Sequence, residues 1–293
     1  MKISIDMTVS HSEPRWTYSA HGPSFHHRSH EEIRTLCRNA GFSGIEAHAK
    51  LFPDMDGDAI EEEGRRYRAA GLKIDSFHLP YGVADDVAAL YETGRRAAVE
   101  TMKTTLHAAA RLGARVAILH PSTARLDLRV ESFDTCLRAL GRSLEELLPL
   151  AETLNIVIAL ENLPSADMER FGTLPEHFCR FHEQFAHPNL GFCLDTGHAL
   201  ISRHAHAAEF HDAMKPAIAA FHLEDNAGDR DSHLAPGRGL VNWSEVARYM
   251  EEVGFVHAAC VEAPPFAHGL LYSSEAWCEL HEQTCRALGS TLP

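Results

Sequence analysis

Residues 189–198 read Asn189-Leu190-Gly191-Phe192-Cys193-Leu194-Asp195-Thr196-Gly197-His198. The mainly apolar run Leu190–Leu194 predicts a strand that is buried on both faces. An acid and an imidazole, Asp195 and His198, follow directly, and a carboxylate at the mouth of a buried strand is a candidate metal ligand or catalytic base. The structural alternative is a strand-to-helix turn in which Asp195 or Thr196 caps the helix.

The same pattern, an apolar run that ends in His, Asp or Glu, recurs along the whole chain. Eight strand candidates, each followed by a helical stretch, repeat roughly every 30 to 40 residues. They are Lys2–Val9, Gly44–His48, Lys73–Pro80, Arg115–Pro121, Asn155–Asn162, Leu190–Leu194, Ala217–Asp225 and His257–Pro264. Eight such units most economically close into a (β/α)8 TIM barrel of the α/β class. A doubly wound open sheet is the alternative, but no Gly-x-Gly-x-x-Gly follows the first strand candidate.

The length and the apolar content are consistent with one large core. A chain of 293 residues that is 45% hydrophobic can form a single barrel domain over residues 1–293, with a long loop at about 10–29. Its seven cysteines include no Cys-x-x-Cys pair, which argues against a disulfide framework and against a thiolate zinc site.

Charge and hydropathy exclude several classes of partner. The formal net charge of −14 opposes a general affinity for nucleic acid phosphates or anionic membranes and favours a small-molecule substrate. No apolar stretch approaches the roughly 20 residues that a membrane span needs, and Asp6 interrupts the N-terminal run where a signal peptide would continue. We therefore expect a cytoplasmic protein. Homo-oligomerisation stays open, since no interface stripe is evident.

Side chains that can bind metals or transfer protons stand at the carboxyl ends of the strand candidates. Such ends converge on one face of a barrel, where enzymes of this architecture place their sites. The set comprises Glu46 or His48, His78, His120, Glu161, Asp195 with His198, His222 and Glu262, joined by Asp231 and His233 from the loop after the seventh strand. Taken singly, each His could be a satisfied hydrogen-bonding group and each Glu could pair with an arginine.

Three converging carboxylates would repel one another unless a cation lies between them. A bound divalent metal resolves that conflict. The oxygen-rich set Glu161, Asp195, His222 and Glu262 suits Mn²⁺, Mg²⁺, Co²⁺ or Zn²⁺, and it contains no thiolate that would favour zinc. The sequence therefore predicts a metal centre.

Several motifs together resemble the xylose isomerase-like barrel superfamily. They are Glu161-Asn162, Asp195-x-x-His198, His222 with Asp225, His233-x-x-Pro236-Gly237-x-Gly239, and Glu262. The resemblance covers nearly the whole chain and is greatest to the sugar phosphate isomerase/epimerase group. It implies that Glu161, Asp195, His222 and Glu262 hold one divalent metal, commonly Mn²⁺, and that Glu161 and Glu262 act as acid/base groups. Glu46, Asn162, His198 and Arg238 would then bind substrate hydroxyls. Their structural alternatives are a turn hydrogen bond for His198, a surface charge for Arg238 and a solvated loop acid for Glu46.

The implied chemistry is proton abstraction next to a metal-chelated carbonyl. Return of the proton to the same carbon epimerises a sugar, keto-sugar or cyclitol, and return to the adjacent carbon isomerises it. A dehydratase of the keto-cyclitol or dehydroshikimate type would use the same chemistry. No convincing phosphate-binding loop appears, which favours an unphosphorylated substrate.

Another branch of the superfamily, the endonuclease IV-like zinc phosphodiesterases, provides a competing interpretation. Its metal pattern also has counterparts here, in which His78, His120, His198, Asp231 and His233 would bind further metals rather than substrate. The acidic loops after the second, third and seventh strand candidates oppose DNA binding. We therefore expect the isomerase or epimerase activity, with the nuclease as an alternative.

Overall fold

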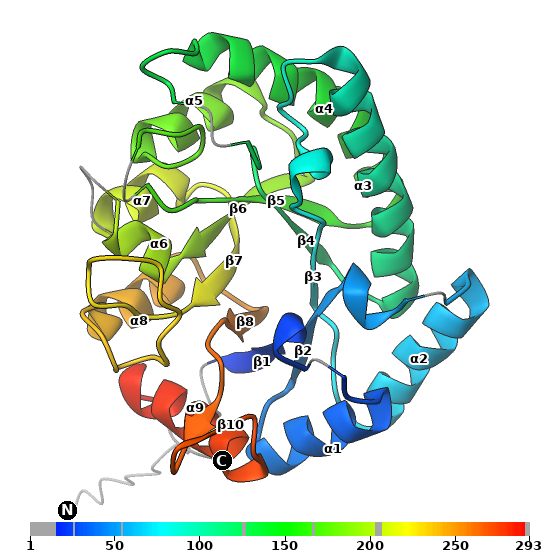
Figure 1. Cartoon of the computed structure of the whole chain (residues 1–293), viewed down its shortest axis with the longest axis vertical. Coiled ribbons are helices and arrows are strands. Elements are labelled where there is room, and N and C mark those ends of the chain that lie inside the picture. Colours follow the sequence, from blue (N-terminus) through cyan, green and yellow to red (C-terminus); the bar gives the residue numbers. More distant parts are fainter. Residues whose placement is uncertain are drawn as a thin grey trace, which may run out of the picture.

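Eight parallel strands close into a barrel in the order β1 to β8, and helices surround it (Figure 1). The structure is a computed structural model that describes residues 16–25, 27–53, 55–124, 127–165, 168–202 and 207–290. β1 pairs with both β2 and β8, so that Ala20 lies opposite Ile45 on one side and Val261 on the other. This architecture confirms the predicted single (β/α)8 barrel.

The strands are short and largely buried. They are β1 (Thr17–His21), β2 (Gly44–His48), β3 (Ser76–His78), β4 (Val116–Leu119), β5 (Val157–Glu161), β6 (Leu190–Asp195), β7 (Ile218–Leu223) and β8 (Ala258–Val261). A small antiparallel pair, β9 (Phe266–Ala267) and β10 (Leu270–Leu271), follows the barrel. Strands two to eight therefore lie where the sequence predicts them.

The first strand is a correction to the sequence prediction. Lys2–Val9, the predicted first strand, lies outside the described residues, and β1 occupies Thr17–His21 within the loop expected at about 10–29. The loop prediction was therefore wrong for this segment. Trp16 and Tyr18 are buried, and Tyr18 Oη lies 2.5 Å from Ser290 Oγ beyond the last helix. Contacts from the far end of the chain thus help to fix a segment whose own sequence is polar and aromatic.

The helices between the strands lie on the outside of the barrel. They are α1 (His30–Ala40), α2 (Gly57–Ala69), α3 (Glu92–Leu112), α4 (Phe133–Leu154), α5 (Pro175–Gln184), α6 (Thr196–Leu200), α7 (Ala207–Met214), α8 (Trp243–Glu252) and α9 (Ser274–Ala287), with 3-10 turns η1 (Gly22–Phe25), η2 (Ala49–Leu51) and η3 (Val83–Asp85). Local signals set their ends: Ser29 and Glu32 form a capping box on α1, and Gly41 ends it at φ 92°. Within the described residues no helix is long and apolar enough to cross a membrane.

Two hydrophobic clusters form the core. The larger lies between the strands and the helices, and the smaller contains side chains of β4 to β7, namely Val116, Ile118, Ala159, Cys193 and Ala220. Since side chains alternate along a strand, Glu161, Asp195 and His222, two positions beyond members of the smaller cluster, share its face. The apolar cluster thus continues into polar groups at the carboxyl ends of the strands.

Candidate metal centre and active site

The four predicted metal ligands come together. Glu161 ends β5, Asp195 ends β6, His222 lies in β7, and Glu262 follows β8 directly. One ligand atom from each lies within 4.8 Å of the others. His222 Nδ1 is 3.1 Å from Glu161 Oε1, 3.4 Å from Glu262 Oε1 and 4.0 Å from Asp195 Oδ2. Three carboxylates and one imidazole therefore face a common point.

The electrostatics of this group fit a cation. All four residues are at most 5% exposed. Burial raises the pKa of Asp195 to about 6, and the neighbouring carboxylates of Glu161 and Glu262 add to the effect. Asp195 Oδ2 accepts no hydrogen bond from the described residues. A buried carboxylate oxygen without a donor, next to two further carboxylates, is what a divalent metal would satisfy.

Glu46 lies behind His222 rather than at the surface. Its Oε2 is 3.2 Å from His222 Nε2 and accepts a 2.7 Å hydrogen bond from Ser76 Oγ. The residue is 1% exposed. A carboxylate on the second ring nitrogen of a metal-ligating histidine fixes the ring and its tautomer, leaving Nδ1 for the metal. The burial of Glu46 contradicts the solvated loop acid that the sequence allowed, and the carboxylate lies where it can position the His222 ring.

A second group forms on the other side of Glu161. His78 Nε2 and His120 Nε2 lie 3.4 Å and 3.1 Å from Glu161 Oε2. One ligand atom from each of these three residues also lies within 4.8 Å of the others. Tyr81 packs against both histidine rings, with centroids 4.9 Å and 5.0 Å away. These histidines can hold a second metal with Glu161 or donate hydrogen bonds to it.

A third group lies at the loop after β7. His198 Nε2 is 3.3 Å from Asp231 Oδ2, and His233 Nε2 is 3.4 Å from Asp231 Oδ1. Although burial acts to lower the pKa of His198, Asp195 and Asp231 raise it to about 10. All five residues predicted to serve a second metal or the substrate therefore lie beside the first group, in two clusters.

The side chains of two predicted substrate-binding residues, Asn162 and Arg238, do not join the group of carboxylates. Asn162 is fully buried; its Nδ2 donates to the Asp195 carbonyl at 2.9 Å, and its Oδ1 accepts from the Asp195 amide at 2.8 Å. It therefore fixes the backbone of Asp195 and has no surface for substrate. Arg238 is exposed, and among the described residues no ion pair joins it to the carboxylates. The sequence could not distinguish these positions, since both residues lie within matching motifs.

Two further residues of the site escaped the sequence analysis. His21, at the end of β1, places Nε2 3.2 Å from Glu262 Oε1. It lies in the segment that was expected to form the loop at about 10–29, so no predicted strand end marked it. Glu224 follows His222 by two positions and is fully buried, within 4.8 Å of ligand atoms of Asp195 and His198. Strand alternation could have found it, since residues 222 and 224 share a face.

Comparison with protein families agrees with the fold. The family described as "xylose isomerase-like TIM barrel" matches residues 35–279. The chain is 27% identical to an uncharacterized protein, y4fM, of Sinorhizobium fredii, over 87% of this chain and 88% of that protein. It is 28% identical to an uncharacterized protein, MJ1311, of Methanocaldococcus jannaschii, over 63% of this chain and 62% of that protein.

Solved structures of sugar epimerases share the barrel. A D-tagatose 3-epimerase-like protein superposes with a TM-score of 0.76 at 21% identity, covering 94% of this chain and 98% of that one. The 3-keto-D-glucoside 4-epimerase YcjR of E. coli gives 0.75 at 17% identity, covering 92% and 99%. D-psicose 3-epimerase of Clostridium cellulolyticum gives 0.74 at 15% identity, covering 92% and 97%. At these identities the likeness establishes a common fold.

Proposed function

The chain belongs to the xylose isomerase-like TIM barrel family, and from this premise we propose that it is a divalent-metal-dependent isomerase or epimerase of a sugar, keto-sugar or cyclitol. One observation carries the proposal. Glu161 Oε1 and Glu262 Oε1 lie 3.1 Å and 3.4 Å from the Nδ1 atom of His222, and Asp195 completes the group. The epimerase structures of the same fold support the substrate class.

Two carboxylates at one centre suit proton transfer at carbon. A divalent cation held by these four residues would supply Lewis-acid stabilisation of the negative charge on a carbonyl and its neighbouring hydroxyl. Burial acts to raise the pKa of Glu262, but His222 and His21 lower it to about 2. Glu262 is therefore ionised at neutral pH and can accept a proton. Glu161, at the end of β5, would then exchange a proton with the same centre as the second carboxylate.

The identity of the metal belongs to the proposal. Mn²⁺ is the first candidate, followed by Zn²⁺, Co²⁺ and Mg²⁺, because the ligand atoms are mainly carboxylate oxygens. Cys260 lies close to Glu46, His222 and Glu262. Burial raises the pKa of this thiol well above its ordinary value in the metal-free protein.

The two additional clusters favour a second candidate. Groups of His78, His120 and Glu161, and of His198, Asp231 and His233, border the first group. Together the three groups are consistent with an endonuclease IV-like zinc phosphodiesterase, in which neighbouring metals stabilise attacking and leaving oxygens. A keto-cyclitol or dehydroshikimate-type dehydratase would use the first group alone. The net charge of −14 still favours a small-molecule substrate over DNA.

Turnover of Glu161→Gln and Glu262→Gln tests the acid/base assignment. Incubation of ketoses and keto-cyclitols in D₂O, followed by NMR, measures exchange of the proton next to the carbonyl. We expect the wild type to exchange and epimerise or isomerise a substrate, and each variant to lose at least about a hundredfold in kcat. Glu152→Gln, an exposed acid on α4, is the control. Full turnover by both site variants would refute the assignment.

Metal stoichiometry separates the two candidate functions. One tightly bound ion per chain supports the isomerase or epimerase. Three zinc ions together with salt-dependent cleavage of duplex DNA at abasic sites would replace it by the phosphodiesterase.

A further inference from the structure

A pocket of about 640 Å³ lies next to the carboxylate centre, over the segments that follow β1, β2 and β3. Small-molecule sites commonly occupy about 300–1,000 Å³. Its lining combines apolar side chains with Arg28, His30, His48, Lys50 and Tyr81. Because these segments are at the carboxyl ends of the strands, the pocket opens on the same face of the barrel as the site.

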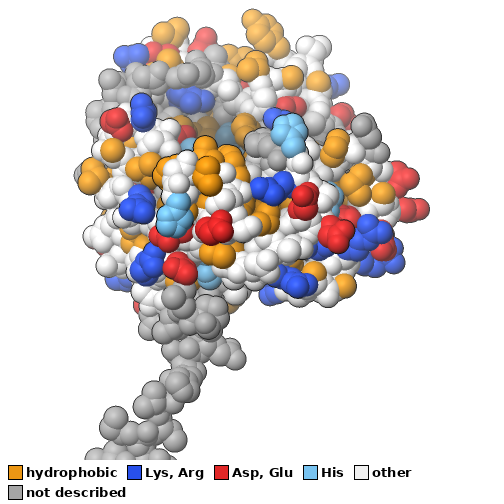
Figure 2. Space-filling view, turned by 60° about the horizontal axis from the view of Figure 1, so that its bottom comes forward, with side chains coloured by type: hydrophobic (Ala, Val, Ile, Leu, Met, Phe, Trp, Pro, Cys, Tyr) orange, Lys and Arg blue, Asp and Glu red, His pale blue; other side chains and the backbone are white. Residues whose placement is uncertain are grey.

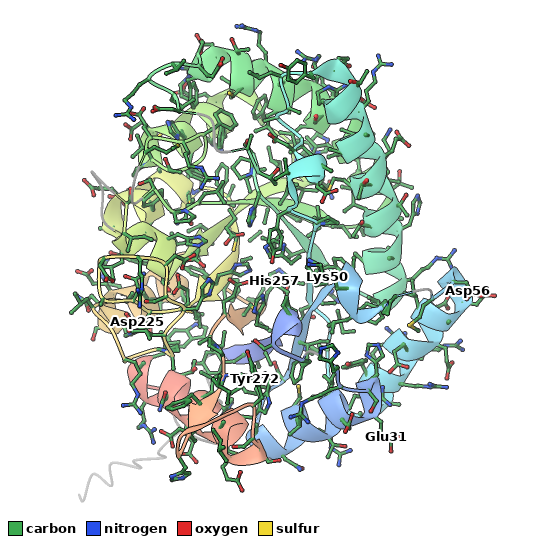
Figure 3. All side chains as sticks on the ribbon, in the orientation of Figure 1. Glu31, Lys50, Asp56, Asp225, His257 and Tyr272 are labelled. Carbon is green, nitrogen blue, oxygen red and sulfur yellow. The ribbon has the colours of Figure 1, made fainter. Side chains whose placement is uncertain are left out.

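The charge of this pocket differs from that of the whole molecule. Arg28 and Lys50 line it, and no Asp or Glu is among its described lining residues, although the chain carries a net charge of −14. Figure 3 shows Lys50 beside the barrel opening, whereas Glu31 lies on the outer helix α1 and Asp56 lies at the start of the outer helix α2. The described residues provide no ion-pair partner for Lys50. Two permanent positive charges, with no acid among the described lining residues, form an environment that favours an anion.

Hydrogen bonds hold donors in place around the pocket. Arg28 Nη2 donates to the Tyr272 carbonyl at 2.8 Å, which fixes the guanidinium and leaves other N–H groups. The backbone amide of Lys50 donates to His48 Nδ1 at 3.1 Å. Burial lowers the pKa of His48 to about 4, and nearby His78 and Lys50 add to this. His48 is therefore neutral, and since Nδ1 accepts, its ring proton lies on Nε2.

His30 serves the structure rather than the pocket. Its Nε2 is 2.9 Å from the Leu51 carbonyl and its Nδ1 is 3.1 Å from Tyr67 Oη. Both ring nitrogens are therefore used. Arg28 and Lys50 remain the groups with the charge to bind an anion.

Aromatic rings connect the pocket to the carboxylates. The ring of His48 lies 6.2 Å from that of His78 and 5.8 Å from that of Tyr81. His78 Nε2 lies 3.4 Å from Glu161 Oε2. One ligand can therefore occupy the pocket with one end and reach the carboxylate centre with the other.

We propose that this pocket binds an anionic group of the substrate, a phosphate or a carboxylate, through Arg28 and Lys50. The inference rests on the proposed function, because it names the class of sugar or cyclitol that reaches Glu161. It departs from the expectation of an unphosphorylated substrate. That expectation followed from the lack of a contiguous phosphate-binding motif, whereas these two cations come from separate segments, Arg28 from the stretch before α1 and Lys50 from η2.

Calorimetric titration with inorganic phosphate tests the pocket without turnover. Chelator-treated protein at low ionic strength is titrated, so that phosphate cannot bind through a metal. We expect the dissociation constant to rise at least tenfold in Lys50→Met and further in Lys50→Met with Arg28→Gln. Lys73→Met and Arg115→Gln remove the same charges at exposed positions before β3 and β4, at the opposite end of the barrel, and should bind as the wild type does. Equal affinity in Lys50→Met and in Lys73→Met would overturn the inference.

Matched substrates distinguish the two anions and separate this inference from the proposed function. D-fructose, D-fructose 6-phosphate and D-fructuronate are compared as substrates with the metal-loaded protein. For one of the two charged compounds, the ratio of its kcat/KM to that of D-fructose should exceed one. In Lys50→Met this ratio should fall at least tenfold. Turnover that prefers D-fructose, with a ratio unaffected by Lys50→Met, would overturn the inference and leave the proposed function intact. Phosphate binding that depends on Lys50, without turnover of any ketose, would support the pocket and contradict the proposed function.

Discussion

Individual residues at this site have roles that depend on one or two neighbours. Gly197, in the Asp195-Thr196-Gly197-His198 stretch, is an example, because a Cβ atom there would overlap the carboxyl group of Glu224. Glu224 is fully buried, and burial together with Asp195 raises its pKa to about 11, so it is a neutral acid at pH 7. The glycine is therefore required for space, whereas the sequence alone suggested a turn.

Gly197→Ala is expected to destabilise the protein by about 1–3 kcal/mol, because the new methyl group forces Glu224 to move within a packed interior. Chemical denaturation measures the change in the free energy of unfolding. In the background of Glu224→Ala the same substitution should have a much smaller effect, since the overlapping carboxyl group is gone. An equal effect in both backgrounds would show that the overlap with Glu224 is not the cause.

His177 provides the clearest dependence of stability on pH. Its Nδ1 accepts the backbone amides of Gly172, Thr173 and Leu174 at 3.2–3.3 Å, and burial lowers its pKa to about 4. The folded state thus holds this ring neutral, whereas the unfolded chain protonates it near pH 6.5. Its contribution is fully present above pH 6.5 and is lost as the pH falls towards 4.

We expect His177→Gln to be less stable than the wild type by about 2 kcal/mol at pH 7.5, with the difference shrinking as the pH falls from 6.5 to 4. Urea denaturation at a series of pH values gives both curves. His107→Gln, at an exposed position on α3, should show no such convergence. A difference that is independent of pH would contradict the neutral state of His177.

Strands and loops show why much of the site could be predicted and part of it could not. Apolar runs in the sequence predicted strands β2 to β8. Because strand ends converge in a barrel, Glu161, Asp195, His222 and Glu262 could be predicted to lie together. β1 could not, because Thr17–His21 is polar and aromatic, and its pairing with β2 and β8 fixes it. The missed strand concealed His21. Beyond a strand end, the direction of a side chain is set by its partners, which the sequence does not show. The contacts of Glu46 with His222 and of Asn162 with the Asp195 backbone could therefore not be predicted.

Asp225 organises the loop that carries Asp231 and His233. Its Oδ1 accepts the amides of Asn226 and Val241, and its Oδ2 accepts the amide of Gly237 and Nε1 of Trp243, at 2.9–3.0 Å. The carboxylate is fully buried. Both of its oxygens are therefore needed as acceptors.

Asp225→Asn should destabilise the protein by about 2–4 kcal/mol, because an amide has one acceptor oxygen and its NH₂ group would face two donors. Thermal denaturation measures the loss. Asp229→Asn removes an acid from the exposed part of the same loop and serves as the control. If both variants melt at the same temperature, the four hydrogen bonds do not determine the stability of this loop.

The surface of the molecule is less informative than its interior. Figure 2 shows a face on which hydrophobic side chains gather among acidic and basic ones. Phe266, Leu270 and Leu271, in the β9–β10 pair, are more than half exposed, at 57%, 61% and 55%. The features that specify chemistry are instead those that closure of the barrel collects from the whole chain. The candidate site could therefore be predicted from the residues at strand ends, whereas contacts on the surface could not be predicted in this way.

At the scale of the molecule, the proposed metal joins four consecutive strands or strand ends, β5 to β8. Without a cation, burial and the neighbouring carboxylates of Glu161 and Glu262 disfavour the charged form of Asp195, as its raised pKa indicates, and this destabilises the fold at neutral pH. A ligand that binds only the folded state stabilises it by about 2.7 kcal/mol at a concentration one hundred times its dissociation constant. For a chain of this size that corresponds to a rise in Tm of roughly 4 °C.

Calorimetry of chelator-treated protein with and without added Mn²⁺ measures this stabilisation independently of activity. We expect the rise in Tm in the wild type and in Asp58→Asn, which removes an exposed acid on α2. Asp195→Asn should lose the rise, and its metal-free form should melt at or above the metal-free wild type, because one of three repelling carboxylates has become neutral. A carboxylate that stabilises the barrel by itself would instead give an Asp195→Asn variant with a lower Tm than the metal-free wild type, so this comparison distinguishes it from a metal ligand. If Mn²⁺, Zn²⁺, Co²⁺ and Mg²⁺ all leave the melting temperature of the wild type unchanged, the four side chains do not form a metal centre.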